Sequence, residues 1–462
     1  MIGVVMRRWS LLLLLAALVP AQARANGAFP DSLSILLPRG QPDRITLATN
    51  FGLVFTSDAA ATWEWTCEHD ASLGAILYQL APPPRQSIFA LGLDLVRSDD
   101  DGCSWKATGG RVASGFLYDL FVDPSDGQRV LAIADPNDET PTQVHVFEST
   151  DGGDSFPRSL FAAESGVQLT FLEVPLTEPG TLYVTWTSSK TGTLRSGMIR
   201  VRERGADVQT FDWTDVLGGE PLGIAAVDRQ DPRKIFLRAF GTQRDRLAIS
   251  EDGGMTVRVA LEASRTLAGL VVRADGAVFA ATRDLGGGVL YVSRDGGKTF
   301  PTMLPGPRFK ALADRDGRLY AAADEPNDGY ALAVSDDDGR TWKPILHLTD
   351  VARVKSCPGT ALPQACAGTC MRLAFLNIFR PQICPFSALK DGGPPDAAAP
   401  DAATIPPSPP DSCDCRLGGR GGAAGGLLLI LLAAGRAAAC RRGVGRGRKA
   451  RFAVGGNSAK VR

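Results

Sequence analysis

Short runs of β-branched, aliphatic and aromatic residues recur along most of the chain, separated by clusters rich in Gly and Asp. In one period these runs are 267–273, 277–282, 289–293 and 300–304. Runs of this length between turn residues are typical of strands, so each period is predicted to hold four. The first run of a period is largely apolar, as at 77–80, 169–174 and 223–227, which is typical of buried strands.

Six segments share the pattern Ser/Thr-x-Asp-x-Gly-x-Ser/Thr followed by a hydrophobic residue. They are TSDAAATW at 56–63, SDDDGCSW at 98–105, STDGGDSF at 149–156, SEDGGMTV at 250–257, SRDGGKTF at 293–300 and SDDDGRTW at 335–342. Each is predicted to be the hairpin between the third and fourth strands of its period. In it the Asp carboxylate accepts backbone N–H groups, the Gly takes a positive φ and the aromatic residue packs between sheets. The structural aspartates are therefore Asp58, Asp100, Asp151, Asp252, Asp295 and Asp337.

A calcium-binding loop is the alternative for the SDDDG segments. That loop needs an oxygen ligand at its first position, where Arg97 or Val334 stands here. We therefore expect no metal at these hairpins and no cofactor elsewhere.

The spacing of the six aspartates predicts the number of repeats. Successive steps are 42, 51, 101, 43 and 42 residues, so the step of 101 spans two periods, one of which has lost its pattern. Its remnant is the segment 198–213, which still ends in Trp213. Four strands per repeat of this length are typical of propellers. We predict an all-β fold, a seven-bladed β-propeller of four-stranded antiparallel blades, over residues 26–350.

Both ends of the chain differ from the repeats. Residues 1–25 combine a basic start, a short apolar run and small residues before a cleavage site, as in a signal peptide. Residues 351–390 form a Cys-rich extension, and residues 391–412 a disordered Pro/Ala-rich linker. Residues 413–462 hold Cys413 and Cys415, an apolar transmembrane stretch at 421–440 and a basic tail.

The cysteine pair, apolar stretch and basic tail resemble a C-terminal sorting signal of the MYXO-CTERM type. The resemblance implies export to the cell surface or outer membrane, or secretion, with Cys413 and Cys415 as candidates for the processing site. Two features depart from it, because Arg436 interrupts the apolar stretch and the chain runs on to Arg462. An ordinary membrane anchor is the alternative.

Charge and cysteine content narrow the function classes. Residues 26–412 carry 36 basic and 49 acidic residues, a net charge of −13, which disfavours nucleic acid as a partner. Six cysteines precede the linker, an even number that favours disulfides in an exported chain. They are Cys67, Cys103, Cys357, Cys366, Cys370 and Cys384, and the last four leave three pairings open.

The hairpin pattern resembles the BNR/Asp-box repeats of sialidases, xyloglucanases, sortilin-type receptors and the photosystem II assembly factor family. That resemblance implies the propeller fold and no single function. The run WEWTC at 63–67, the segment CSW at 103–105 and the tail also resemble surface propellers of myxobacteria. This second resemblance implies a Cys67–Cys103 bridge between the first two blades.

We expect a non-catalytic, monomeric propeller that binds a protein or glycan partner and meets a membrane only through its C-terminal segment. Long polar loops between second and third strands are the expected binding rim, since recognition often resides in such loops. The candidate residues are Glu139, Lys190, Arg195, Arg244, Arg283, Asp324, Glu325 and Tyr330.

The alternative is a sialidase-like or other glycoside hydrolase. Such an enzyme needs two nearby carboxylates, for which Glu173 and Asp228 are the best pair. No tyrosine has an evident glutamate partner, and His69, His145 and His347 lie in unrelated settings, so catalytic residues are not predicted.

The C-terminal segment, residues 413–462, is expected to be removed from the mature protein. A helix of about twenty residues just crosses the roughly 30 Å hydrocarbon core, and Arg436 makes this one costly to keep there by a few kcal/mol. We predict that the mature protein ends near Cys413. An intact-mass measurement on protein from its native host checks this, and a mass that includes residues through Arg462 would mean a lasting anchor.

Overall fold

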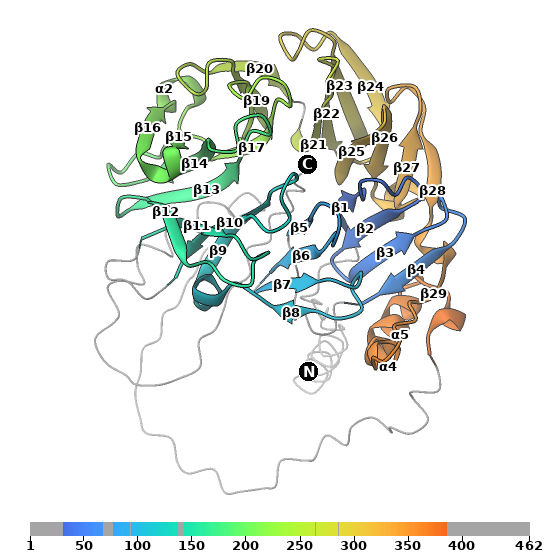
Figure 1. Ribbon diagram of the computed structural model, residues 1–462. Coiled ribbons are helices and arrows are strands. Elements are labelled where there is room, and N and C mark those ends of the chain that lie inside the picture. The colour runs from blue at the N-terminus through green and yellow to red at the C-terminus, as the bar shows by residue number, and fades with distance from the viewer. Residues whose placement is uncertain are drawn as a thin grey trace, which may run out of the picture.

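The computed structural model describes residues 31–67, 77–92, 94–136, 143–263, 265–284 and 286–385. These residues form seven sheets arranged in a ring (Figure 1), each built around four antiparallel strands. The predicted seven-bladed, all-β fold is confirmed. The predicted signal peptide, linker and C-terminal segment, with Cys413 and Cys415, lie outside the described residues. Within the described part of the chain, no helix has the length and apolar character needed to cross a membrane.

The blades follow one another along the chain. Blades one to three are β1 (Ser32–Leu36), β2 (Ile45–Thr49), β3 (Gly52–Thr56), β4 (Trp63–Thr66); β5 (Leu77–Leu80), β6 (Ile88–Leu91), β7 (Leu95–Ser98), β8 (Lys106–Ala107); and β9 (Phe116–Val122), β10 (Val130–Asp135), β11 (His145–Ser149), β12 (Arg158–Ala162). Blades four and five are β13 (Val167–Glu173), β14 (Leu182–Ser188), β15 (Arg195–Arg202), β16 (Asp207–Asp212); and β17 (Leu222–Val227), β18 (Ile235–Ala239), β19 (Arg246–Ser250), β20 (Arg258–Glu262). Blades six and seven are β21 (Thr266–Val272), β22 (Val278–Asp284), β23 (Gly287–Ser293), β24 (Thr302–Gly306); and β25 (Ala311–Arg315), β26 (Arg318–Ala322), β27 (Leu332–Ser335), β28 (Lys343–Leu346).

Short helices lie in the connections and at the C-terminal side. They are η1 (Gly110–Ser114), η2 (Glu203–Gly205), α2 (Thr214–Leu217), α3 (Glu325–Asp328), η3 (Leu348–Asp350), α4 (Leu362–Ala365), α5 (Ala367–Phe375) and η4 (Pro381–Ile383).

The first strand of each blade lies nearest the ring axis, and these inner strands contact one another around the ring, with β25 returning to β1. Side chains also join neighbouring inner strands. Gln79 Oε1 accepts the N–H of Val122 at 2.9 Å, and Asp119 Oδ2 accepts that of Leu172 at 2.9 Å. These hydrogen bonds satisfy backbone groups that would otherwise be left unpaired in the buried centre.

The apolar core lies between the faces of successive blades. Where blades four and five meet, Met198, Trp213, Ile224 and Leu237 are all buried in one cluster. Trp213 therefore supplies the aromatic side chain that the sequence assigned to the repeat without a hairpin pattern. In that blade η2 connects β15 to β16, with Arg204 at φ 55°.

The six repeated segments, here called aspartate hairpins, have the predicted geometry. At Asp295, one carboxylate oxygen accepts the N–H of Thr299 at 3.0 Å and the other accepts its hydroxyl at 2.7 Å. The Ser293 hydroxyl donates to the same carboxylate at 2.7 Å and accepts the N–H of Gly297 at 2.8 Å. Asp58, Asp100, Asp151, Asp252 and Asp337 make the equivalent bonds.

These hydrogen bonds favour the charged carboxylate. Donation from Thr62 lowers the pKa of Asp58 to about 2, and donation from Thr341 lowers that of Asp337 to about 2. The aspartate side chains are therefore part of the turn itself. Ala60, which replaces Gly in the first hairpin, takes a positive φ of 71°.

A C-terminal extension, residues 351–385, closes the ring from outside. Its strand β29 (Val351–Val354) pairs in parallel with β4, so the first blade has five strands. Beyond β29, the N–H of Lys355 donates to the Trp65 carbonyl at 2.7 Å. Phe379 packs edge-on against Trp65, with ring centroids 5.1 Å apart. The extension thus belongs to the same core as the first blade.

The disulfides correct one expectation. The Cys67–Cys103 bridge implied by the resemblance to surface propellers is wrong: Cys67 is bonded to Cys366 and Cys103 to Cys357. The reason is the pairing of β29 with β4, which brings the extension alongside the ends of the first two blades. The third bridge joins Cys370 to Cys384 within the extension.

Candidate functional site

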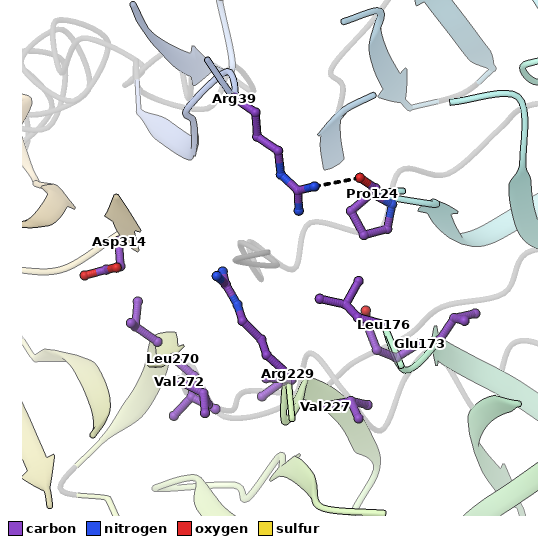
Figure 2. A pocket seen from close by; sticks show the side chains of 13 residues that line it. Arg39, Pro124, Glu173, Leu176, Val227, Arg229, Leu270, Val272 and Asp314 are labelled. Atoms are coloured by element: carbon purple, nitrogen blue, oxygen red, sulfur yellow. Dashed lines mark hydrogen bonds between the residues drawn. The ribbon is translucent and has the colours of Figure 1, made fainter. Parts of the chain in front are cut away.

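A pocket lies on the ring axis, and Figure 2 shows it from close by. Its lining comes from six of the seven blades, at the ends of inner strands and in the loops that follow them. It therefore sits at the end of the axis that also carries the aspartate hairpins, and we call it the channel mouth. Its volume is about 120 Å³. The lining residues are Arg39, Pro124, Glu173, Val174, Leu176, Ala225, Ala226, Val227, Arg229, Leu270, Val271, Val272 and Asp314.

Arg39 reaches the mouth from the loop between β1 and β2. Its Nη1 donates to the Pro124 carbonyl at 2.8 Å, across to the third blade. The backbone of this loop is fixed from both sides: Gln86 donates to the Arg39 carbonyl at 2.8 Å, and Arg315 of β25 donates to the Arg44 carbonyl at 2.8 Å. The seventh, first and second blades thus jointly position this guanidinium.

Arg229 lies opposite, in the turn after β17. Asp228 forms that turn, because its Oδ1 accepts the N–H groups of Gln230 at 2.9 Å and Asp231 at 3.1 Å. The Arg229 side chain extends from the turn toward Arg39 (Figure 2). Within the described part of the chain, no hydrogen bond or ion pair engages its guanidinium.

Two carboxylates also line the mouth. Asp314 of β25 accepts Arg273 Nε at 2.8 Å, and Arg273 also donates to the Gly317 carbonyl at 2.7 Å. Glu173, the last residue of β13, is 8% exposed. Aliphatic side chains such as Leu176, Val227, Leu270 and Val272 form the rest of the wall (Figure 2).

Of the carboxylate pair that the hydrolase alternative requires, only Glu173 lines the mouth. Asp228 is instead the turn-forming residue that precedes Arg229. Arg39 and Arg229 were not predicted from the sequence, since each lies in a short polar turn of ordinary composition. One sequence feature could have pointed to Arg229. It is the second residue of an Asp-x-x-Asp turn that follows a predicted inner strand.

The described residues that were predicted for the binding rim lie at the other end of the axis, in the connections between second and third strands or at the strand ends beside them. Several are paired with a neighbour: Lys190 with Glu164 at 3.4 Å, Arg195 with Asp212, Arg244 with Glu262 at 3.3 Å, and Asp324 with Lys310 at 3.3 Å. Asp324, Glu325 and Tyr330 share the loop of the seventh blade, whereas the other described candidates come from the fourth, fifth and sixth. Arg283 lies in β22, and Glu139 lies outside the described residues.

Glu325 ties this loop to the start of the extension. Both of its carboxylate oxygens lie 2.9 Å from the N–H of Leu348, in the short helix before β29. Burial raises the pKa of Glu325 to about 6, although the bond from Leu348 and the nearby His347 favour its charged form.

Comparison with known proteins finds similarities among solved structures only, all at low sequence identity. No family model matches the sequence, and no curated protein does. Among solved structures, the chain is similar to a GH74 enzyme of Niastella koreensis, with 12% identity, a TM-score of 0.40, and coverage of 71% of this chain and 66% of that one.

Two other similar structures differ in kind. The extracellular domain of the putative one-component system BT4673 from B. thetaiotaomicron has 11% identity, a TM-score of 0.48, and coverage of 69% and 41%. A puromycin-hydrolyzing peptidase of Mycobacterium tuberculosis has 12% identity, a TM-score of 0.47, and coverage of 70% and 55%. The chain spans less than two thirds of the length of each of these three proteins.

The raised pKa of Glu325 makes the stability of the protein depend on pH. Its folded-state pKa is about 6, above its ordinary value of 4.5, so its contribution to stability is fully present below pH 4.5 and is lost as the pH rises through 6. Glu325→Gln should therefore gain about 1 kcal/mol of unfolding free energy relative to wild type between pH 4.5 and pH 8, after allowance for solvent screening.

Urea unfolding at these two pH values measures the change. Glu164→Gln, the same substitution at a side chain that is 87% exposed, is the control. A gap between Glu325→Gln and wild type that does not change with pH would contradict the assignment.

Proposed function

We propose that the protein is an exported, non-catalytic propeller of the BNR/Asp-box type that binds a small ligand at its channel mouth. One observation supports this most: the Arg39 and Arg229 side chains, from loops on opposite sides of the axis, point toward one another over an apolar wall (Figure 2). Pockets with apolar walls and a few convergent polar groups are typical of ligand sites.

The carboxylates favour binding over hydrolysis. A glycoside hydrolase needs an acid and a second carboxylate placed at the reacting bond. Asp314, which lines the mouth, is paired with Arg273, and Asp228, which does not line it, accepts the hydrogen bonds of its own turn. The lining residues include no tyrosine that could act as the nucleophile of a sialidase.

The disulfides and the two ends of the chain support export. Three bridges among the described cysteines suit an oxidising compartment. The predicted signal peptide and the MYXO-CTERM-like tail then carry the propeller to the cell surface, the outer membrane or the medium. The loop rim at the other end of the axis remains, from the sequence, the expected surface for a protein or glycan partner.

The absence of catalysis is testable. Exported protein should release no fluorophore from fluorogenic sialosides or glucosides above the level of a buffer blank. Turnover that is present in wild type and lost in Glu173→Gln would contradict a non-catalytic function.

Binding at the mouth is tested separately, by a thermal-shift screen of small anions and neutral sugars. Ligands that raise the melting temperature of wild type should do so less in Arg229→Met. Arg85→Met is the matched control, because Arg85 is an exposed arginine in the corresponding loop of the second blade and does not line the pocket. Equal shifts in all three proteins would place the ligand elsewhere.

A further inference from the structure

We propose that the ligand of the channel mouth is a small aliphatic carboxylate, a single carboxylate on an apolar body of about four to six carbons. This inference rests on the proposed function, since it names the ligand class of the same site. Its support comes from the charge, the chemistry and the size of the pocket.

Charge at the mouth points to an anion. A guanidinium carries five N–H donors, and Arg39 has one hydrogen bond, to Pro124, whereas Arg229 has none within the described residues. Neighbouring guanidinium groups repel one another, and a carboxylate between them relieves that repulsion while accepting hydrogen bonds from both. Asp314 does not serve this purpose, because it is already paired with Arg273.

The direction of the two side chains adds a geometric argument. Arg39 and Arg229 come from the first and fifth blades, and their turns are held by hydrogen bonds between side chains and the backbone, so their Cα positions are fixed before a ligand arrives. Planar guanidinium forks suit the two oxygens of a carboxylate, which fixes the orientation of the ligand as well as its charge. The carboxylate of the ligand therefore lies between the two arginine turns, with its body against the aliphatic wall.

The chemistry of the wall points to an aliphatic body. Nine of the thirteen lining side chains are apolar, and the other four are the two arginines and two acids. None is a hydroxyl, an amide or an aromatic ring. A sugar would lose hydrogen bonds to water here without side-chain hydroxyls or amides to replace them, and it would find no ring to stack on. Burying methylene groups, by contrast, contributes about 0.8 kcal/mol each.

The size of the pocket limits the length of that body. Its volume of about 120 Å³ is somewhat smaller than the roughly 150 Å³ of an apolar protein cavity that binds benzene. A chain of four to six carbons fits this space, and a long fatty acyl chain does not. A phosphate, with more negative charge and no apolar part, would leave the wall in contact with water.

Isothermal titration calorimetry of the full exported protein tests the proposal with four probes: hexanoate, hexanamide, glucuronate and inorganic phosphate. Hexanoate should bind most tightly. Hexanamide, which lacks the charge of hexanoate, should bind wild type with an association constant about tenfold to hundredfold lower. Hexanoate should bind Arg229→Met with a similar loss, because that variant lacks the charge of the guanidinium. Arg39→Met should weaken hexanoate in the same direction, and Arg85→Met should match wild type.

Each other outcome overturns the ligand class. If glucuronate or phosphate binds in an Arg229-dependent manner and hexanoate does not, the aliphatic body is wrong while the mouth stays a binding site. If hexanoate binds wild type and both mouth variants equally, the site itself is wrong, and the proposed function fails with it. If none of the probes binds at millimolar concentration, the carboxylate class is wrong, and the thermal-shift screen alone then decides the proposed function. Unchanged melting temperatures of the unliganded variants show that the substitutions leave the fold intact.

Discussion

The parallel pairing of β29 with β4 is the interaction on which the rest of this molecule depends. A ring of seven blades must join its last blade to its first, or both are left with open faces. Here the inner strands β25 and β1 touch, and Lys310 donates to Asp31 at 2.8 Å beside them. The chain then continues past the seventh blade and adds β29 to the outer edge of the first. The ends of the propeller are thus joined both at the axis and at the periphery.

Covalent bonds reinforce this closure. Cys67–Cys366 and Cys103–Cys357 span 299 and 254 residues, so each removes a large amount of freedom from the unfolded chain. For loops this long the entropic stabilisation is roughly 6 kcal/mol for the first bridge, and less for the second because the two share most of their loop. Lys355, just beyond β29, also donates to the Asp101 carbonyl at 3.0 Å in the second blade. The extension therefore holds the first two blades together as well as the first and last.

Closure also determines the candidate site. The channel mouth takes residues from six blades, so its shape exists only when the ring is complete. Arg39 shows this directly, because its loop is fixed by Arg315 of the seventh blade and Gln86 of the second. An open ring would separate these contacts and move one of the two guanidinium groups away from the other. The binding proposed for the mouth therefore depends on the same ring closure that the extension stabilises.

The sequence predicted those features that local pattern or regular spacing controls. The aspartate hairpins are built from bonds within eight residues, so six copies could be recognised, and their spacing revealed the blade that lacks one. The disulfide pairing could not be derived in that way, since it depends on β29 meeting β4 from almost three hundred residues away. Arg39 and Arg229 were missed for a related reason: each turn is unremarkable alone, and the two converge only across the closed ring. Asp228 was named from the sequence as a carboxylate for the hydrolase alternative, whereas its hydrogen bonds show that it forms a turn.

A tryptic map of the non-reduced protein tests the closure most directly. The six described cysteines fall in peptides 45–85, 98–106, 356–372 and 373–390. If the extension is bonded to the first two blades, all four peptides form one linked species, which reduction separates. A species that links 45–85 to 98–106 alone, with 356–372 bonded only to 373–390, would contradict the account.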